Sequence, residues 1–352
     1  MTESICYENL ADALNSLPNG YPRTESGVEI RILEKIFTPE EAILACQLSR
    51  EYETVETIAQ RIGLAEEQTR HQLFQMAKRG LVWFSKEEGK AFFRLAPFVV
   101  GIYEAQLEIL DAELAGFAEE YFKQDAATGI MKPQPALHRV LPAQNTVADE
   151  WILPYEDVRA ILLSAQVYNV RDCICRAQKG LIDDPCEYPR EICLNFSNID
   201  RPPRPGDISR PEALALLEKS EQVGLVHTVS NVKDGVGYIC NCCSCCCVIL
   251  RAITENGILN SVAHANYFAV IDGDICSNCG TCVERCQVNA ISEGDGISVV
   301  ERVKCIGCGL CVTGCTTGAA RLERKPEAEI IHPPADFATW EIERLRNRGL
   351  AD

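Results

Sequence analysis

The spacing of apolar and polar positions predicts a mainly helical first part of the chain, over residues 26–122, with one hairpin. Short helices are expected at about 54–62, ended by Gly63, and at about 66–79, ended by Gly80, because glycine is typical of left-handed helix C-caps. The runs LVWFS and KAFFRL, separated by KEEG, then predict two β-strands joined by a turn.

Two further helices are expected on either side of these elements. Thr38, Pro39 and Glu41 combine an N-cap, a first-turn proline and a capping-box glutamate, so a helix should begin there. A long helix is expected from about 102 to 122, because apolar residues recur at spacings of three and four: Tyr103, Leu107, Leu110, Leu114, Phe117 and Tyr121. That stripe fits either core packing or a homodimer interface.

The middle of the chain has a mixed pattern. Prolines interrupt residues 123–150, which we interpret as a linker with one extended piece. Helices are expected to begin at Pro154 and at Pro211, and GLVHTVS (224–230) is expected to be a strand. A final helix is expected at about 338–348.

Composition narrows the classes of function. The 352 residues carry a formal net charge of −17, which disfavours a nucleic-acid binder, because phosphate binding rests on a basic surface. An acidic surface either fits a partner with basic docking patches or serves only solubility. No stretch is apolar over the length that spans a bilayer, and the N-terminus lacks a basic start followed by an apolar run, so a cytoplasmic protein is expected.

Cysteine is the most informative residue type. Most of the 20 cysteines lie in three tight groups, with gaps too short for a disulfide framework. Thiols stay reduced in the cytoplasm, where clustered cysteines are typical of metal ligands. The last group consists of CSNCGTCVERC (276–286) and CIGCGLCVTGC (305–315), which are two copies of C-x2-C-x2-C-x3-C.

This repeat resembles the bacterial ferredoxin with two [4Fe–4S] clusters, over about residues 268–325. In such a module three cysteines of one motif bind one cluster, and the fourth reaches the other cluster. The resemblance implies these ligand sets: Cys276, Cys279, Cys282 and Cys315 for cluster one, and Cys305, Cys308, Cys311 and Cys286 for cluster two. Gly280, Gly307 and Gly309 fit loops in which the backbone wraps closely around a cluster.

The sequence departs from the ferredoxin family after the fourth cysteine of each motif. The family usually has proline there, whereas Gln287 and Thr316 follow in this chain. The change alters the local turn and removes no ligand. Structural zinc is the alternative occupant of this module, and the doubled motif at this spacing argues against it.

Ten more cysteines lie in the middle region. The first group is Cys173, Cys175, Cys186 and Cys193. Four thiolates within this short stretch suffice for one closed iron–sulfur or zinc site. The second group is the run CNCCSCCC, with Cys240, Cys242, Cys243, Cys245, Cys246 and Cys247. Arg176, next to the first group, offers either a donor to cluster sulfur or a surface ion pair.

The run CNCCSCCC allows several arrangements. A strand would place Cys243, Cys245 and Cys247 on one face, and Cys242 and Cys246 on the other. A loop would gather four thiolates onto one cluster, or would share ligands with the first group across two metal centres. One or two further iron–sulfur clusters, a zinc ion and a redox-active disulfide stay open, and we favour a cluster.

Four other residues need an interpretation because of their chemistry. His227 and His264 lie near the run, and each is expected to be a hydrogen-bonded structural histidine rather than a ligand. Cys6 and Cys46 are isolated in sequence, and Cys46 falls in an apolar stretch typical of a core position.

The whole arrangement is similar to a family of ferredoxin-type iron–sulfur proteins from anaerobic bacteria and archaea. Its marks here are a helix, turn, helix and hairpin that resemble a winged-helix domain over 27–96, then CICR, CNCCSCCC and the two-cluster tail. The resemblance implies electron transfer to a partner redox enzyme, either a flavoenzyme or a larger oxidoreductase complex. Two alternatives are a redox-sensing winged-helix regulator, with 66–80 as its recognition helix, and a reductase with a catalytic cluster in the middle domain.

The predicted fold class is therefore an α+β multidomain chain. Its expected segments are a winged-helix-like domain plus long helix (1–122), a linker (123–150), a cysteine-rich mixed α/β domain (151–267), a two-[4Fe–4S] ferredoxin domain (268–325) and a tail with a short helix (326–352). We expect an electron-transfer component of an oxidoreductase rather than a stand-alone enzyme, without DNA binding or membrane insertion.

Overall fold

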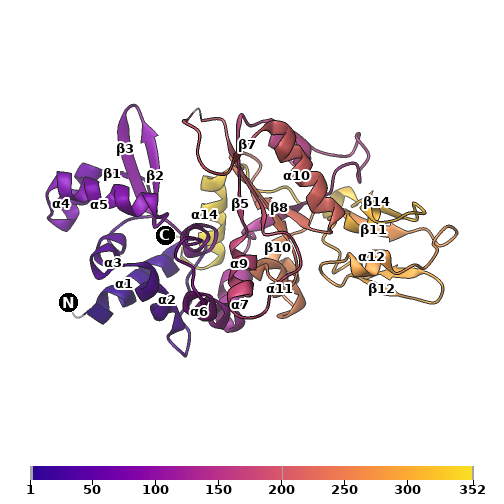
Figure 1. Ribbon diagram of the computed structural model, residues 1–352, viewed down its shortest axis with the longest axis horizontal. Coiled ribbons are helices and arrows are strands. Elements are labelled where there is room, and N and C mark those ends of the chain that lie inside the picture. The colour runs from indigo at the N-terminus through magenta and orange to yellow at the C-terminus, as the bar shows by residue number, and fades with distance from the viewer. Residues whose placement is uncertain (1–2, 200, 351–352) are drawn as a thin grey trace. The chain divides into compact units, whose positions relative to one another are not determined.

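The computed structural model describes residues 3–199 and 201–350 and divides into two compact units. Unit 1 comprises Met1–Ile130, Gln178–Asp184 and Arg344–Asp352, and unit 2 comprises Met131–Ala177 and Pro185–Glu343. Both helices and several separate sheets occur, as the predicted fold class requires (Figure 1). Within the described residues, every helix is too short or too polar to cross a membrane.

Unit 1 combines helices with a small antiparallel sheet. Its helices are α1 (Glu3–Ser16), α2 (Val28–Ile36), α3 (Pro39–Ala45), α4 (Val55–Ile62), α5 (Glu66–Lys78) and α6 (Ala112–Lys123), and α7 (Asp125–Met131) follows at its boundary. The sheet has the order β1 (Glu53–Thr54), β3 (Lys90–Leu95), β2 (Val82–Glu87). Thr38 caps α3 in a capping box with Glu41, and Gly63 ends α4 at φ 72°, so both predicted helix signals are confirmed.

The long helix expected over 102–122 is wrong. Residues 98–105 form two irregular turns, η1 (Phe98–Ile102) and η2 (Tyr103–Ala105), in which Val100 has φ 60°. Helix α6 begins only after Asp111, whose side chain accepts a hydrogen bond from the Leu114 amide at 2.8 Å. The apolar stripe does not form one continuous helix, because the Asp111 N-cap begins a new helix inside it. Its members Tyr103 and Tyr121 are nevertheless buried in unit 1, which supports the core-packing interpretation.

Unit 2 is built on a sheet to which the described residues contribute seven strands. Their order is β10 (Val262–Ala263), β4 (His138–Leu141), β8 (Val226–Ser230), β9 (Tyr238–Cys242), β6 (Glu191–Ser197), β5 (Val167–Asp172) and β7 (Asp207–Ile208). Only the β10–β4 pair is parallel among the described strands. The strand expected at 224–230 is β8, and the extended piece expected within 123–150 is β4, which pairs with β8 inside the sheet.

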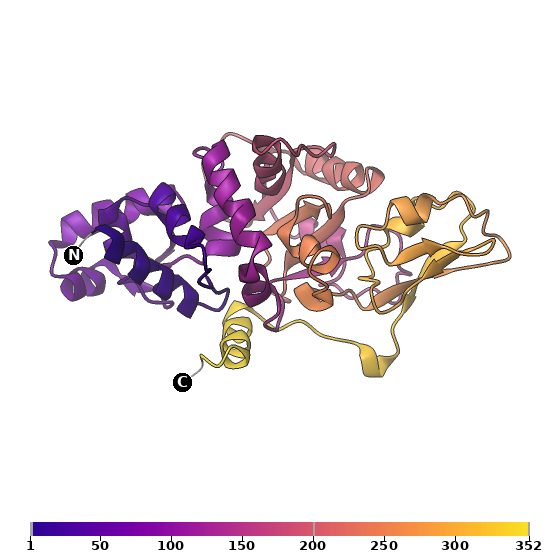
Figure 2. The ribbon, with the colours of Figure 1, turned by 90° about the horizontal axis from the view of Figure 1, so that it is seen from below.

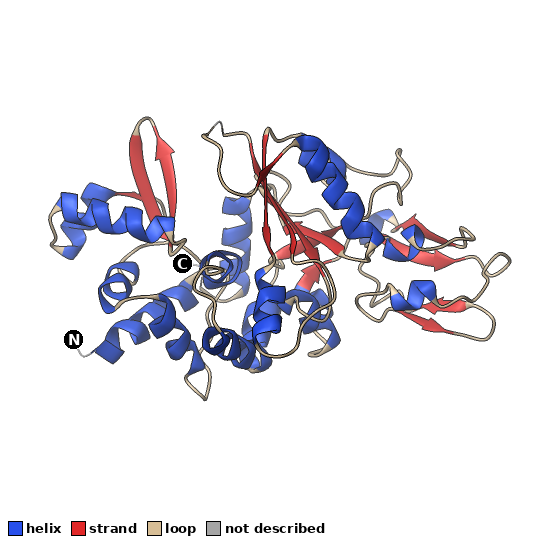
Figure 3. Ribbon diagram, in the orientation of Figure 1, coloured by secondary structure: helices blue, strands red, loops and turns tan. Residues whose placement is uncertain are grey.

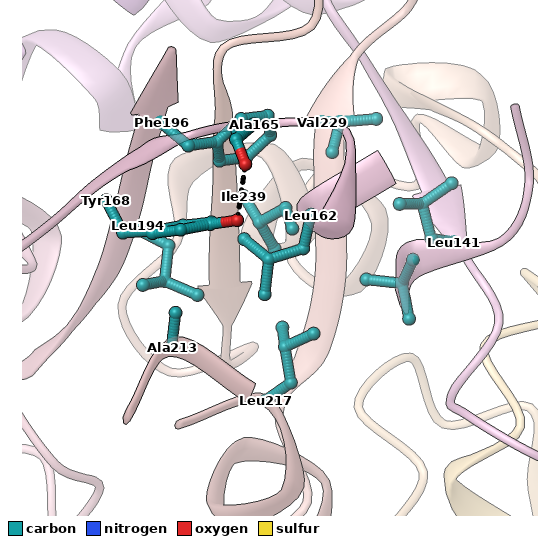
Figure 4. Close-up of a cluster of buried hydrophobic side chains, with 11 residues drawn as sticks. Leu141, Leu162, Ala165, Tyr168, Leu194, Phe196, Ala213, Leu217, Val229 and Ile239 are labelled. Carbon is teal, nitrogen blue, oxygen red and sulfur yellow. Dashed lines mark hydrogen bonds between the residues drawn. The ribbon is translucent and has the colours of Figure 1, made fainter. Parts of the chain in front are cut away.

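Two helices cover one face of this sheet. Helix α8 (Val158–Leu163) begins at Asp157 rather than at Pro154, because the Asp157 carboxylate accepts hydrogen bonds from the Arg159 and Ala160 amides. Helix α10 (Arg210–Gln222) begins where expected, after a Ser209 capping box. The core between helices and sheet consists of Leu141, Val158, Leu162, Ala165, Tyr168, Leu194, Phe196, Ala213, Leu217, Val229 and Ile239 (Figure 4). The Tyr168 hydroxyl has a hydrogen-bond partner within this core, because it donates to the Ala165 carbonyl at 2.6 Å.

The opposite face of the sheet carries thiols. Because side chains alternate along a strand, Cys193 points away from the Leu194 side of β6, and Cys240 and Cys242 point away from the Ile239 side of β9. Helix α9 (Ile174–Leu181) follows β5, and α11 (Val248–Thr254) follows the cysteine run. The strand pattern therefore brings cysteines from distant parts of the sequence to one face.

The last part of unit 2 is the ferredoxin-type region. Strand β11 (Tyr267–Ile271) pairs with β14 (Ala320–Arg324), and β12 (Ile291–Glu293) pairs with β13 (Ser298–Val300). Each cysteine motif contributes a short helix, α12 (Thr281–Glu284) and α13 (Leu310–Thr313). Figure 2 shows this segment, in orange and yellow, gathered into one lobe of unit 2, and Figure 3 shows its helices and strands. The described residues also form η3 (Leu259–Ser261), η4 (Glu327–Glu329) and the expected final helix, α14 (Phe337–Asn347).

Candidate metal centres

Each ferredoxin motif folds as a tight loop followed by a one-turn helix. Gly280 and Gly309 precede α12 and α13 with φ 78° and 76°, a conformation that favours glycine. A Cβ on Gly307 would lie 2.5 Å from the Tyr267 carbonyl oxygen, so no larger residue fits there without movement. The expectation that these glycines serve closely wrapped loops is thus consistent with their backbone.

The eight cysteines of the two motifs lie around two cavities. Cys305, Cys308, Cys311 and Cys286 line one cavity, and Cys276, Cys279, Cys282 and Cys315 line the other. The two cavities are equal in size. In both cases the fourth cysteine comes from the other motif, which is the crossed grouping that the ferredoxin resemblance implies. Four thiols around each of two equal cavities fit a pair of [4Fe–4S] clusters.

Backbone amides point at several of these sulfurs. Cys305 Sγ accepts from the Ala269 amide at 3.4 Å, Cys286 Sγ from Ala290 at 3.2 Å, and Cys315 Sγ from Ala320 at 3.3 Å. Such bonds stabilise negative charge on the sulfurs and so shift the reduction potential of a bound cluster. Burial raises the pKa of Cys311 to about 12, so its thiolate needs the positive charge of a metal centre to form at neutral pH.

The two cavities differ in exposure. Cys305 and Cys311 of the second ligand set are buried, whereas Cys279 of the first set is exposed. Exposed carboxylates also lie along the segments of the first set, at Asp274, Glu284, Glu293 and Asp295. The first centre is therefore the one that faces solvent.

The ten middle cysteines divide in a way that the sequence groups do not. Cys186, Cys243, Cys245 and Cys246 form one compact group, in which all four sulfurs lie within 4.8 Å of one another. The interpretation of the first sequence group as one closed site is therefore wrong, because Cys186 leaves its neighbours and joins the CNCCSCCC run. Of the alternatives, the structure matches the sharing of ligands between the two sequence groups. We call this set the four-thiol group.

Of the strand and the loop that the sequence leaves open for this run, the structure shows a strand that ends in a turn. Strand β9 ends at Cys242, and residues 244–246 form a turn that the Cys247 amide closes by donating to the Cys243 carbonyl at 3.1 Å. Because of this turn, successive side chains do not alternate between two faces as they would in a strand. It places Cys243, Cys245 and Cys246 together and leaves Cys242 and Cys247 on the other side.

The remaining middle cysteines form a second set, the six-thiol group. Its members are Cys173, Cys175, Cys193, Cys240, Cys242 and Cys247. The thiols of this group shift one another's pKa: Cys175 and Cys193 lower that of Cys173, Cys193 and Cys242 raise that of Cys240, and Cys240 and Cys247 lower that of Cys242. The pairing of Leu194 with Ile239 between β6 and β9 places Cys193 beside Cys240. Sheet register thus assembles thiols from three separate segments.

Arg176 is a buried cation between the two thiol groups. Its side chain is 2% exposed and donates to the Pro189 carbonyl at 3.0 Å and to the Asn241 carbonyl at 2.9 Å. Burial by itself would lower the pKa of this guanidinium, but the charges of Cys243 and Cys173 raise it above its usual value. Of the two roles expected for Arg176, a surface ion pair is excluded by burial.

The asparagine of the run and both histidines have structural hydrogen bonds. His227 Nδ1 and Asn241 Oδ1 lie 2.6 Å apart, and His227 Nε2 lies 3.1 Å from Glu221 Oε1. Asn241 also donates to the Ile192 carbonyl at 2.6 Å. His264 Nε2 lies 2.8 Å from the Leu259 carbonyl oxygen, and burial lowers its pKa. These contacts agree with the expected structural role of the two histidines.

Gln287 is the residue whose role sequence reasoning missed. The departure from proline after Cys286 was its only signal. Gln287 is buried, and its Oε1 accepts from the Ser244 amide at 2.8 Å, inside the CNCCSCCC run. Its Nε2 donates to the Tyr188 hydroxyl and to the Gly224 carbonyl, both at 2.9 Å. Thr316, at the equivalent place in the other motif, is exposed. Gln287 thus joins the motif that ends in Cys286 to the middle region.

Comparison with known proteins bears on the last part of the chain. Residues 268–316 match the model of the 4Fe-4S dicluster domain family. No curated protein and no solved structure matches the chain. The match covers both cysteine motifs, so residues 268–316 are similar to a 4Fe-4S dicluster domain.

Proposed function

We propose that this protein passes single electrons through two [4Fe–4S] clusters to a partner redox enzyme. The observation that carries the proposal is the pair of cavities, each lined by four cysteines in the crossed grouping of a dicluster domain. Each cluster supplies a one-electron carrier. The chain's own residues contribute eight thiolates, the amides that donate to sulfur, and loops that exclude water from the second centre.

The proposed ligand sets are those given above, and the six-thiol group is the proposed site of a further iron–sulfur cluster in the middle domain. Thiolates select iron–sulfur clusters and zinc over harder metals. Six thiols on three segments can supply the four thiolates that a [4Fe–4S] cluster takes. Reduced thiols require a reducing compartment, so we propose a cytoplasmic location.

The proposed direction of docking follows from exposure. Cys279 lies at the exposed centre among Asp274, Glu284, Glu293 and Asp295, whereas the second centre adjoins the middle region through Gln287. A partner with a basic patch would therefore approach the first centre, because opposite charges accelerate encounter. Electrons would then pass between the first centre, the second centre and the middle domain.

The winged-helix-like elements of unit 1 fit a docking platform better than a DNA reader. A reader needs cations that are free to reach phosphates and base edges. On the candidate recognition helix α5, Arg70 pairs with Glu66 at 2.6 Å, and just past its end Arg79 pairs with Glu41 at 2.6 Å. These pairs and the net charge of −17 favour protein partners.

The test is an electron-transfer chain in which the protein is the only link. A flavoenzyme that reduces ferredoxins, its reduced nicotinamide substrate and cytochrome c are mixed under argon, with and without the purified chain. We expect cytochrome c reduction to depend on the chain, and a Cys279→Ala and Cys308→Ala double variant to abolish it. A fully loaded protein that neither accepts nor donates electrons in this assay, or when dithionite replaces the flavoenzyme, would contradict the proposal.

A further inference from the structure

We propose that the four-thiol group, Cys186, Cys243, Cys245 and Cys246, binds a single Zn²⁺ ion in tetrahedral geometry. This centre shares no cysteine with the two dicluster cavities or with the six-thiol group. The proposal goes beyond the electron-transfer function and holds whether or not the chain carries electrons.

The first argument is the spacing of the sulfurs. The distances are 3.8 Å for Cys186–Cys243, 3.4 Å for Cys186–Cys245 and 3.7 Å for Cys245–Cys246. Four sulfurs at about 2.3 Å from one zinc ion form a tetrahedron with edges of about 3.8 Å. The three distances lie close to that edge. In a [4Fe–4S] cluster each thiolate binds a different iron and points outward from the cube, so its sulfurs must lie further apart.

The second argument is a comparison within the same chain. Among residues 3–199 and 201–350, no other three side chains of the ligand types cysteine, histidine, aspartate and glutamate place their ligand atoms within 4.8 Å of one another. The two dicluster sets lack such close packing, although each lines one cavity. The four-thiol group therefore has a tighter geometry than the sets that match cluster ligation.

The third argument is the electrostatic environment. A zinc ion with four thiolates carries a net charge of about −2, which is costly to bury without compensation. Arg176 is buried beside Cys243 and supplies a positive charge. Its two terminal nitrogens donate to the Pro189 and Asn241 carbonyls, which hold the guanidinium in place next to the thiols. The Tyr188 amide also donates to Cys186 Sγ at 3.4 Å.

The position of the centre indicates what the ion would do. Cys186 comes from the loop before β6, and the other three ligands come from the turn after β9, so one ion would join two segments. Ser244 lies inside that turn and is held by Gln287, the residue after the dicluster ligand Cys286. Since zinc has no redox chemistry, the ion would fix the middle region against the second dicluster centre without carrying electrons itself.

The test compares metal and sulfide content of the full chain purified under argon. We expect about one zinc per chain in the natural protein, on the basis of one four-thiolate site. Cys186→Ala and Cys245→Ala should each remove that zinc and leave iron and acid-labile sulfide unchanged. The two ligands lie on different segments, so their agreement would be specific to one shared site. Cys46→Ala is the matched control, because Cys46 contacts none of these thiols, and it should retain the zinc.

Two results would overturn the proposal. One is a natural protein without zinc. The other is a joint loss of about four irons and four sulfides in the Cys186 and Cys245 variants, which would assign a cluster to this group. If the variants fail to fold, zinc-edge X-ray absorption of the natural protein decides: four sulfurs at about 2.3 Å support the site, and nitrogen or oxygen ligands contradict it. Absence of the dicluster signals with zinc retained would instead contradict the electron-transfer function alone.

Discussion

At the scale of single residues, the functional centres depend on polar side chains that hold thiol-bearing loops. Gln287 is the most consequential of these, because it joins the Cys286 loop to the CNCCSCCC turn through Ser244. The sequence marked this position only as a missing proline, and its partners Ser244, Tyr188 and Gly224 lie 43 to 99 residues away along the chain. No local pattern reports such contacts, which is why the role of Gln287 could not be predicted.

Gln287→Ala should destabilise unit 2. The substitution leaves the half-buried Ser244 amide and the buried Gly224 carbonyl without their partner, which costs about 1–3 kcal/mol in the free energy of unfolding. The melting temperature under argon measures the effect. Gln75→Ala, at an exposed position of α5, is the matched control and should leave the melting temperature unchanged. Equal melting temperatures for both variants would contradict the assigned role.

His138 should make stability depend on pH. Desolvation lowers the pKa of this buried histidine to about 4, whereas it is about 6.5 in the unfolded chain. Between these values the unfolded state binds one more proton, so stability falls as the pH decreases from 6.5 towards 4 and is unaffected by His138 above that window. Melting temperatures from pH 7.5 to 5.5 should therefore fall less steeply for His138→Gln than for the natural protein. Parallel curves would contradict the assignment.

At the scale of elements, the sequence predicts helix boundaries correctly where capping residues and short-range periodicity determine them. The capping box at Thr38, the helix that begins next to Pro211 and the C-cap at Gly63 lie where the sequence predicts them. The long helix failed because the Asp111 cap begins a new helix inside an apolar stripe. The choice between a strand and a loop for the cysteine run could not be made from the sequence, because its turn is stabilised by Gln287, a contact distant in sequence. The grouping of the eight dicluster cysteines follows from the ferredoxin resemblance, whereas the division of the middle ten depends on sheet register.

Helix α10 should be essential for the middle region. Leu217 is fully buried in the core that joins α10 and α8 to the sheet (Figure 4). Leu217→Ala removes packed methyl groups and should cost about 2–5 kcal/mol in the free energy of unfolding. Urea unfolding followed by circular dichroism measures it, with Leu64→Ala as the control, because Leu64 is 42% exposed. A loss as small as that of the control would mean that α10 does not pack as described.

At the scale of the whole molecule, charge and exposure favour docking at the first dicluster centre. The net charge is −17, and Glu293 and Asp295 are exposed near the loop that carries Cys279. Glu293→Gln with Asp295→Asn should slow electron transfer to a basic partner several-fold at low salt, and high salt should reduce that difference because it screens surface charge. Stopped-flow oxidation of the reduced chain measures both rates. A rate independent of these substitutions and of salt would place docking elsewhere.

The central claim is that the chain is an iron–sulfur electron carrier with two [4Fe–4S] centres. The most direct measurement is a reductive titration of the full chain, purified under argon, with iron and acid-labile sulfide counted on the same sample and spectra recorded by electron paramagnetic resonance. The account predicts at least about eight irons, eight sulfides and two electrons taken up per chain, one for each [4Fe–4S] cluster. Zinc in place of iron at the dicluster cysteines, or iron without reversible uptake of electrons, would contradict it.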